Sequence, residues 1–313
     1  MTICVAAIAE NSIVVGASDR MLTAGDVEFE PEQSKIWCFS PSLVALVSGD
    51  ATIQGGLLSL VHKQVQTWIN ADPNKWVNVR DVATLYSKYY RESLRVHAEA
   101  DILAPFGLDT SSFLSPQSRI RREIVADIAE RLAVYDFSTV QETIFLGLDT
   151  DGPVSPKGEP LVYPQIYATH GAYVSKMNSV GFVAIGVGKS HAESHLMFSG
   201  HSQHKSFEET LLATMTAKKR AEVAPGVGKF TDVVLVGPGL GVIEKVQDKH
   251  VKELEGIYRQ IHDSSARSLK EALKKTQLFV ARVRTEREKT QQGITKKKRN
   301  LKPSVARKSV REP

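Results

Sequence analysis

Two pairs of short apolar runs near the start of the chain constrain its fold most strongly. Residues 3–9 and 13–18 flank a polar turn at residues 10–12, and residues 34–39 and 43–47 form a second pair. Apolar runs of this length, separated by so few turn residues, predict β-hairpins. The strands of each pair should therefore run antiparallel within a sheet.

Segments with helical periodicity alternate with these strand pairs. Ile53, Leu57, Val61 and Val65 recur every four residues, which places them on one face of a helix. Residues 99–117 are expected to form a loop. Further helices are expected around 78–89, 120–132, 190–198, 207–223 and 248–288, and further strands at 143–148, 161–169, 181–185, 232–236 and 241–246. This order predicts an α+β protein with two antiparallel sheets between outer helices, a four-layer αββα sandwich.

Composition indicates the compartment. Cys4 and Cys38 are the only cysteines, so a disulfide scaffold is not expected and a reducing compartment fits. Residues 3–9 lack a cationic leader and are followed by a polar turn, which is typical of a strand and not of a signal peptide. No apolar run approaches the length of a membrane span. We therefore expect a cytoplasmic protein without a membrane partner.

The basic residues are concentrated at one end of the chain. Residues 290–313 contain eight Lys or Arg residues and one Glu, whereas the whole chain has a net charge of +5. The rest of the chain is therefore close to neutral. A basic tail of this kind is typically solvated and disordered, but it can also bind polyanions such as nucleic acid through phosphate contacts.

The chain begins with Met1 followed by Thr2. An initiator methionine before a small residue is normally removed, which would leave Thr2 with a free α-amino group. A threonine hydroxyl beside its own α-amine is a known form of activated nucleophile. The α-amine titrates at about pH 8, so it can accept a proton under mild conditions. Thr2 is therefore a candidate catalytic nucleophile.

Several short stretches of the chain, beginning at Thr2, occur in an order and spacing that can be compared with a known family. They are Thr2-Ile3, Ala17-Ser18-Asp19-Arg20, Thr23-Ala24-Gly25, Ser34-Lys35 and Ser48-Gly49-Asp50-Ala51, with 181–188 and 232–236 further along. In this order and spacing they resemble the β-type subunits of the proteasome and the related bacterial peptidase HslV. These are N-terminal-nucleophile (Ntn) hydrolases with the αββα fold. The bacterial proteasome-related proteins of the Anbu type are especially similar.

The resemblance covers residues 2–245 and implies a division of the chain. Residues 99–140 resemble a helical insertion into the Ntn-hydrolase domain. Residues 246–289 are expected to form a helical extension outside the resemblance, and residues 290–313 the basic, disordered tail.

The resemblance also implies a role for each site residue. Thr2 would be the nucleophile, and Lys35 beside its hydroxyl would lower the proton affinity of that oxygen. Asp19 would hold Lys35 in place. The Gly49 N–H would donate to the oxyanion that forms in the transition state. Thr23 would bind an extended substrate through its main chain. The implied activity is that of a threonine peptidase cleaving peptide bonds.

Two positions depart from the pattern of active relatives. Val187 stands where a serine is usual between two glycines. Residues 224–228, which include Val227, stand where an aspartate and a serine are usual. An alternative function is therefore a catalytically inactive, proteasome-like structural subunit. A third hypothesis is an assembly that binds nucleic acid or another polyanion through the basic tail.

The resemblance further implies partners. Peptide or protein substrates are expected, together with self-association into a homo-oligomeric ring or stack. It is also compatible with an ATP-dependent unfoldase as a further partner. No cofactor is expected.

Two motifs suggest other chemistry, but each lacks a residue that its pattern requires. Residues 186–190 read Gly-Val-Gly-Lys-Ser, but the phosphate-binding loop needs a further glycine where Val183 stands. His191 and His195 have a helical zinc-ligand spacing, but the residue after the first histidine is Ala192 and not the required glutamate. Neither a nucleotide nor a metal is therefore expected.

Overall fold

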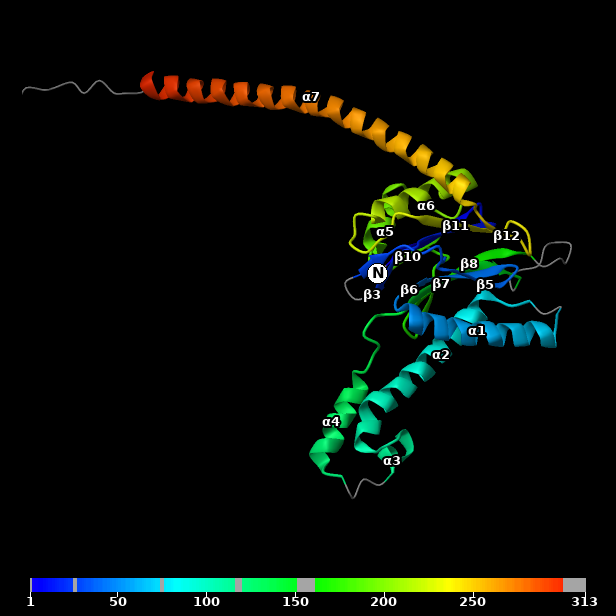
Figure 1. Ribbon diagram of the computed structural model, residues 1–313. Helices are drawn as coiled ribbons and strands as arrows, with labels where there is room; N and C mark the ends of the chain where they lie inside the picture. Colours follow the sequence, from blue (N-terminus) through cyan, green and yellow to red (C-terminus); the bar gives the residue numbers. More distant parts are fainter. Residues whose placement is uncertain (1, 25–26, 74–75, 116–119, 151–160, 301–313) are drawn as a thin grey trace, which may run out of the picture. The chain divides into compact units, whose positions relative to one another are not determined.

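The structure is a computed structural model. It describes residues 2–24, 27–73, 76–115, 120–150 and 161–300 (Figure 1), without the side chains of residues 23, 24, 266 and 283–300. The chain divides into two compact units, Met1–Glu255 and Gly256–Pro313. All strands of the described residues lie in the first unit.

Two antiparallel five-stranded sheets form the frame of the first unit as far as it is described. Their strand orders are β10-β1-β2-β11-β12 and β5-β6-β7-β8-β9. The first sheet contains β1 (Cys4–Ala9), β2 (Ile13–Asp19), β10 (Phe182–Ile185), β11 (Thr231–Val236) and β12 (Ile243–Lys245). The second contains β5 (Ile36–Ser40), β6 (Leu43–Ser48), β7 (Glu142–Asp149), β8 (Tyr163–His170) and β9 (Tyr173–Lys176). The protein is thus of the α+β class, and both predicted N-terminal hairpins are confirmed.

Seven α-helices lie between or after the strands in the described residues. They are α1 (Ala51–Ala71), α2 (Val79–Ala98), α3 (Thr110–Leu114), α4 (Arg122–Ala133), α5 (Lys189–Phe198), α6 (Phe207–Ala221) and α7 (Asp248–Asn300). All of them except α3 lie where helices were predicted. The Asp50 carboxylate caps α1 by accepting bonds from the Thr52 and Ile53 amides. A capping box of Ser206 and Glu209 begins α6. Both caps satisfy amides that a helix start leaves without an intrahelical partner.

Three apolar clusters set the packing of the first unit. One joins the facing sides of the two sheets and includes Ile8, Leu46 and Ile144. A second packs α1 and α2 on the other face of the second sheet, with Tyr86 against Phe145. A third packs α5 and α6 on the other face of the first sheet. Figure 1 shows these two helix pairs on opposite sides of the sheets.

Strand β1 shows how the sequence specifies this packing. All six of its residues are buried. Successive side chains of a strand point to opposite faces. Cys4 and Ala6 accordingly belong to the cluster between the sheets, whereas Val5 and Ala7 belong to the cluster under α5 and α6. A strand covered on both faces needs a continuous apolar run, which is what the sequence has there.

The structure corrects the prediction of a loop at residues 99–117. Helix α2 continues into a π-helical turn (Glu99–Leu103) and a 3₁₀ turn (Ala104–Phe106), and α3 follows. Pro105 is compatible with this because it lies in the first turn of the 3₁₀ segment, where no intrahelical amide is needed. Ile102, Leu103 and Ile128 of α4 form a small core of their own.

Other differences concern short strands and one helix end. The two-stranded ribbon of β3 (Leu22–Ala24) and β4 (Val27–Phe29) was not expected, nor was β9. Helix α7 runs to Asn300, beyond the predicted end near residue 288. The tail predicted to be disordered comprises residues 290–313; its first part, up to Asn300, belongs to α7, and residues 301–313 lie outside the described residues. Within the described residues, no helix combines the length and apolarity that a bilayer crossing requires.

Alanine should have opposite effects at Gly147 in β7 and Gly56 in α1. A Cβ at Gly147 would lie 2.5 Å from the Ser42 backbone oxygen and 2.8 Å from a methyl group of Val79. Gly147→Ala should therefore destabilise the fold by about 1–3 kcal/mol. No atom lies within 4 Å of a Cβ at Gly56, so Gly56→Ala should stabilise its helix by about 0.5–1 kcal/mol. Urea denaturation measures both changes in the free energy of unfolding. An unchanged midpoint for Gly147→Ala would contradict the close packing of β7 against Ser42 and Val79.

Candidate active site

The ends of three strands bring Thr2, Asp19 and Lys35 together. Thr2 immediately precedes Ile3 and β1, Asp19 ends β2, and Lys35 immediately precedes β5. Pairing of β1 with β2 places the start of one strand beside the end of the other, and the Asp19 amide donates to the Ile3 carbonyl at 3.1 Å. Lys35 reaches the same place from the second sheet, where its carbonyl accepts from Val47 at 3.3 Å.

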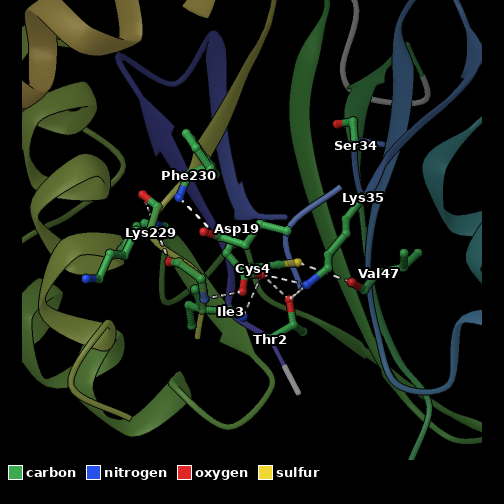
Figure 2. A network of polar contacts seen from close by, with 12 residues as sticks. Thr2, Ile3, Cys4, Asp19, Ser34, Lys35, Val47, Lys229 and Phe230 are labelled. Atoms are coloured by element: carbon green, nitrogen blue, oxygen red, sulfur yellow. Dashed lines mark hydrogen bonds and ion pairs between the residues drawn. The ribbon is translucent and has the colours of Figure 1, made fainter. Parts of the chain in front are cut away.

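The three side chains contact one another directly (Figure 2). Lys35 Nζ lies 2.7 Å from Asp19 Oδ1 in an ion pair. Lys35 Nζ also donates to Thr2 Oγ1, and Thr2 Oγ1 donates to Asp19 Oδ1. The Thr2 hydroxyl is therefore held between an ammonium group and a carboxylate. The sequence predicted these three residues for one site, and the structure brings them together.

The site is almost closed to solvent. Relative exposure is 2% for Thr2, 0% for Asp19 and 7% for Lys35. Charges withdrawn from water are tolerated only when they are paired and their remaining hydrogen-bonding capacity is used. Asp19 meets this condition, because Oδ1 also accepts from the Ile3 amide at 3.2 Å and Oδ2 from the Gly228 amide at 2.8 Å.

This arrangement suits nucleophilic chemistry at Thr2. A cation beside a hydroxyl favours the deprotonated oxygen. At low effective dielectric the interaction is stronger than in water. Asp19 fixes the position of Lys35, so that the ammonium group of Lys35 stays next to Thr2 Oγ1. Lowering the proton affinity of a hydroxyl in this way is one of the general means of activating it as a nucleophile.

Gly49 lies at the end of β6 and has φ +126°. Most residues avoid this conformation, and a Cβ there would collide with the Gln141 side chain. The Oε1 atom of Gln141 accepts a hydrogen bond from the amide of Asp50, the residue after Gly49, at 3.0 Å. Within the described part of the chain, no acceptor is bonded to the Gly49 N–H. Its predicted role as an oxyanion donor stays a prediction that this geometry allows.

Thr23 lies in β3, where it pairs with Glu28 of β4. Its side chain is outside the described part of the structure, so its predicted role in substrate binding stays a prediction.

Gly186 illustrates why the glycine-rich segment after β10 needs its glycines. It has φ +89°, and a Cβ there would collide with the backbone carbonyl of Thr2. Its amide donates to Glu142 Oε2 at 2.7 Å, and the Gly188 amide donates to the Thr2 carbonyl at 3.5 Å. These glycines let the segment approach the residue that carries the candidate nucleophile. Close packing against Thr2 therefore accounts for them without a phosphate.

The histidines near α5 do not converge on a metal site in the described residues. No group of three or more His, Cys, Asp or Glu side chains with suitable geometry occurs there. Burial lowers the pKa of His195, which favours the neutral ring. Burial has the same effect on the pKa of His201, whose ring packs edge-on against Phe182.

The structure adds Glu142, Gly228 and Lys218 to the surroundings of the site. Glu142 holds Gly186, and Gly228 holds Asp19. Lys218 is fully buried and donates to the Gly228 carbonyl at 2.8 Å. The sequence alone does not single out Lys218, because its place on the buried face of α6, four residues after Thr214, is known only from the structure.

A scan against models of protein families matches nothing in this chain, and no curated protein matches it either. The case for a function therefore depends on the side chains around Thr2.

Removal of the Asp19 carboxylate should destabilise the fold strongly. Asp19→Leu leaves the Lys35 ammonium buried without its counter-charge, which typically costs about 3–5 kcal/mol. Adding Lys35→Met to this variant removes the unpaired cation and should restore much of that stability. Urea denaturation of the single and double variants measures the coupling.

The matched control is Glu92→Ala, which breaks an ion pair with Arg95 whose side chains are 59% and 54% exposed. Its midpoint should hardly change, since exposed pairs contribute little. If Asp19→Leu behaves like this control, the buried ion pair is not formed.

The two cysteines should differ sharply toward thiol reagents. Cys4 is fully buried, and burial raises its pKa, so the reactive thiolate is disfavoured. Cys38 is exposed, although partial desolvation raises its pKa in the same direction. Iodoacetamide at pH 8 should modify Cys38 in the folded protein and Cys4 only after unfolding, as peptide mass spectrometry would show. Rapid modification of Cys4 would mean that the region beside Thr2 is open.

Proposed function

We propose that the protein is a threonine-type Ntn hydrolase that cleaves peptide bonds. The contact of Thr2 Oγ1 with both Lys35 Nζ and Asp19 is the observation that carries this proposal. Two antiparallel sheets, each with a helix pair on its other face, support the accompanying proposal of a four-layer αββα Ntn-hydrolase fold.

The proposed reaction begins with removal of Met1, which converts the Thr2 nitrogen from a peptide amide into an α-amine. Thr2 Oγ1 attacks the carbonyl carbon of the substrate, and its proton passes to the α-amine. Lys35 stabilises the developing negative charge, and the Gly49 N–H donates to the oxyanion. Collapse of the tetrahedral intermediate breaks the C–N bond, and the protonated α-amine gives its proton to the leaving amine. Water then hydrolyses the ester on Thr2 and restores the hydroxyl.

The binding of substrate is proposed to use Thr23 and the β3–β4 ribbon. An extended peptide can add to such an edge through main-chain hydrogen bonds. Val27 and Phe29 of β4 are 62% and 47% exposed, so the ribbon also offers apolar contacts.

We further propose that copies of the chain assemble into a homo-oligomer in the cytoplasm. Met197 and Phe198 at the end of α5 are 63% and 89% exposed, a pair of large apolar side chains that an intersubunit contact would cover. Light scattering on the purified protein would count the copies. An ATP-dependent unfoldase as a further partner belongs to the same proposal.

A second candidate is an inactive structural subunit of the same assembly. It is favoured by Val187 and Val227, apolar residues at positions where polar groups are usual in active relatives. Val187 is 48% exposed, and Val227 packs in the cluster under α5 and α6. Neither side chain can position an α-amine or transfer its proton.

Intact-mass spectrometry with a peptide β-lactone separates these candidates. The proposed hydrolase should lack Met1 and gain one adduct at Thr2, because the activated hydroxyl opens the lactone. Thr2→Ala should gain none. Lys35→Met should react about a hundredfold more slowly or worse, because it loses the group that activates the hydroxyl.

Thr2→Ser is the matched control for this experiment, because it keeps a hydroxyl and should still form the adduct. Retention of Met1, or a trimmed chain that never forms the adduct, would exclude the hydrolase and favour the structural subunit.

A further inference from the structure

Lys218 of α6 is a buried lysine whose bonding capacity is fully used. Its relative exposure is 0%. Nζ lies 2.6 Å from Glu222 Oε1, 2.8 Å from the Gly228 carbonyl and 3.1 Å from the Lys229 carbonyl. An ammonium group has three N–H donors, so three acceptors satisfy it.

Gly228 connects this lysine to the candidate active site. Its carbonyl accepts from Lys218, and its amide donates to Asp19 Oδ2 at 2.8 Å. A Cβ at Gly228 would collide with the Glu30 carboxylate, which accepts from the Phe230 amide at 3.0 Å. Lys218 therefore holds the carbonyl of Gly228, and Glu30 occupies the space beside its Cα. The Gly228 amide donates to Asp19, the carboxylate that is paired with Lys35.

A lysine in this place is costly. Burial lowers the pKa of Lys218, since it disfavours the charged form, and the neighbouring Glu222 carboxylate acts in the opposite direction. The rest of the buried face of α6 is uncharged and consists of Thr210, Thr214, Met215, Ala217 and Ala221. An apolar residue would fit such a face without desolvating a cation.

Simple anchoring of the loop does not account for this cost. Lys219, the next residue, already holds the same segment by donating to the Lys229 carbonyl at 3.0 Å, and it bonds to Glu222 as well. What Lys218 adds is the bond to Gly228. Residues 224–228 are Ala-Pro-Gly-Val-Gly, so they contain no side-chain hydroxyl or carboxylate that could support this segment from within.

We propose that Lys218 is a positioning residue of the active site: it fixes Gly228, whose amide orients Asp19 toward Lys35 and Thr2. The inference rests on the proposed hydrolase function. It assigns the support of Asp19 to a buried cation of α6, a helix from which no described residue donates to or accepts from Thr2.

The test compares Lys218→Met with Lys219→Met. The probe is the peptide β-lactone, and intact mass gives its saturation constant and its maximal rate of reaction at Thr2. Lys218→Met should lower the maximal rate about tenfold or more, because small misplacement of a catalytic group has effects of this size. The saturation constant should stay within about twofold, since the probe does not contact Lys218. Lys219→Met should change neither, because it leaves the Gly228 bond intact.

A second variant covers the case in which Lys218→Met fails to fold. Lys218→Met combined with Glu222→Gln removes both charges of this pair, so the carboxylate is not left with Lys219 as its one cationic neighbour. The slower maximal rate should persist in this variant. In the unmodified protein, hydrogen exchange should also find the Gly228 amide strongly protected.

The outcomes distinguish the two proposals. If the unmodified protein reacts at Thr2 and a folded Lys218 variant reacts equally fast, the positioning role is wrong and the hydrolase stands. An equal loss in Lys219→Met, or a rapidly exchanging Gly228 amide, overturns the positioning role in the same way. If the unmodified protein does not react at Thr2, both proposals fail together.

Discussion

The buried ion pair of Lys35 and Asp19 is the interaction on which the arrangement around Thr2 depends. Two charges withdrawn from water are stable only in close contact and with their other hydrogen bonds made. Here the partners come from different sheets, since Asp19 ends β2 and Lys35 precedes β5. The two sheets must therefore pack with these ends together. The apolar cluster between them, formed by side chains such as Ile8 and Leu46, holds this alignment over the length of the strands.

Close backbone approach is the second condition around the ion pair. Gly49, Gly186 and Gly228 lie on three different segments, and a Cβ at each would collide with a neighbouring group: Gln141, Thr2 and Glu30 respectively. The Gly228 amide donates to Asp19, and the Gly186 amide donates to Glu142. Main-chain amides thus add to the polar surroundings of Thr2, whose hydroxyl is contacted by the Lys35 and Asp19 side chains.

The fold was largely predictable because it uses strong periodic signals. The hairpins and the helices with apolar positions every four residues appear where the pattern predicted them. Residues 99–117 were predicted wrongly, because Pro105 and Gly107 suggested a loop where the chain makes short helical turns around a small core. The strands β3, β4 and β9 have only three or four residues each, too few for a periodic pattern. Of the site, Thr2, Asp19 and Lys35 were predictable through their order along the chain, whereas the contribution of Lys218 depends on the tertiary placement of Gly228.

The apolar residues near Thr2 are compatible with an active site of this construction. Val227 packs with Ile3 in the cluster under α5 and α6, so this side of the site is dry. Electrostatic interactions are stronger where water is excluded, provided that every buried charge is satisfied. That proviso is met at Asp19 by the Ile3 and Gly228 amides, and Lys218 in turn donates to the Gly228 carbonyl. Under the proposed function, the buried face of α6 supplies polar support that the side chains of residues 224–228 lack, and the proposed activity of Thr2 depends on it.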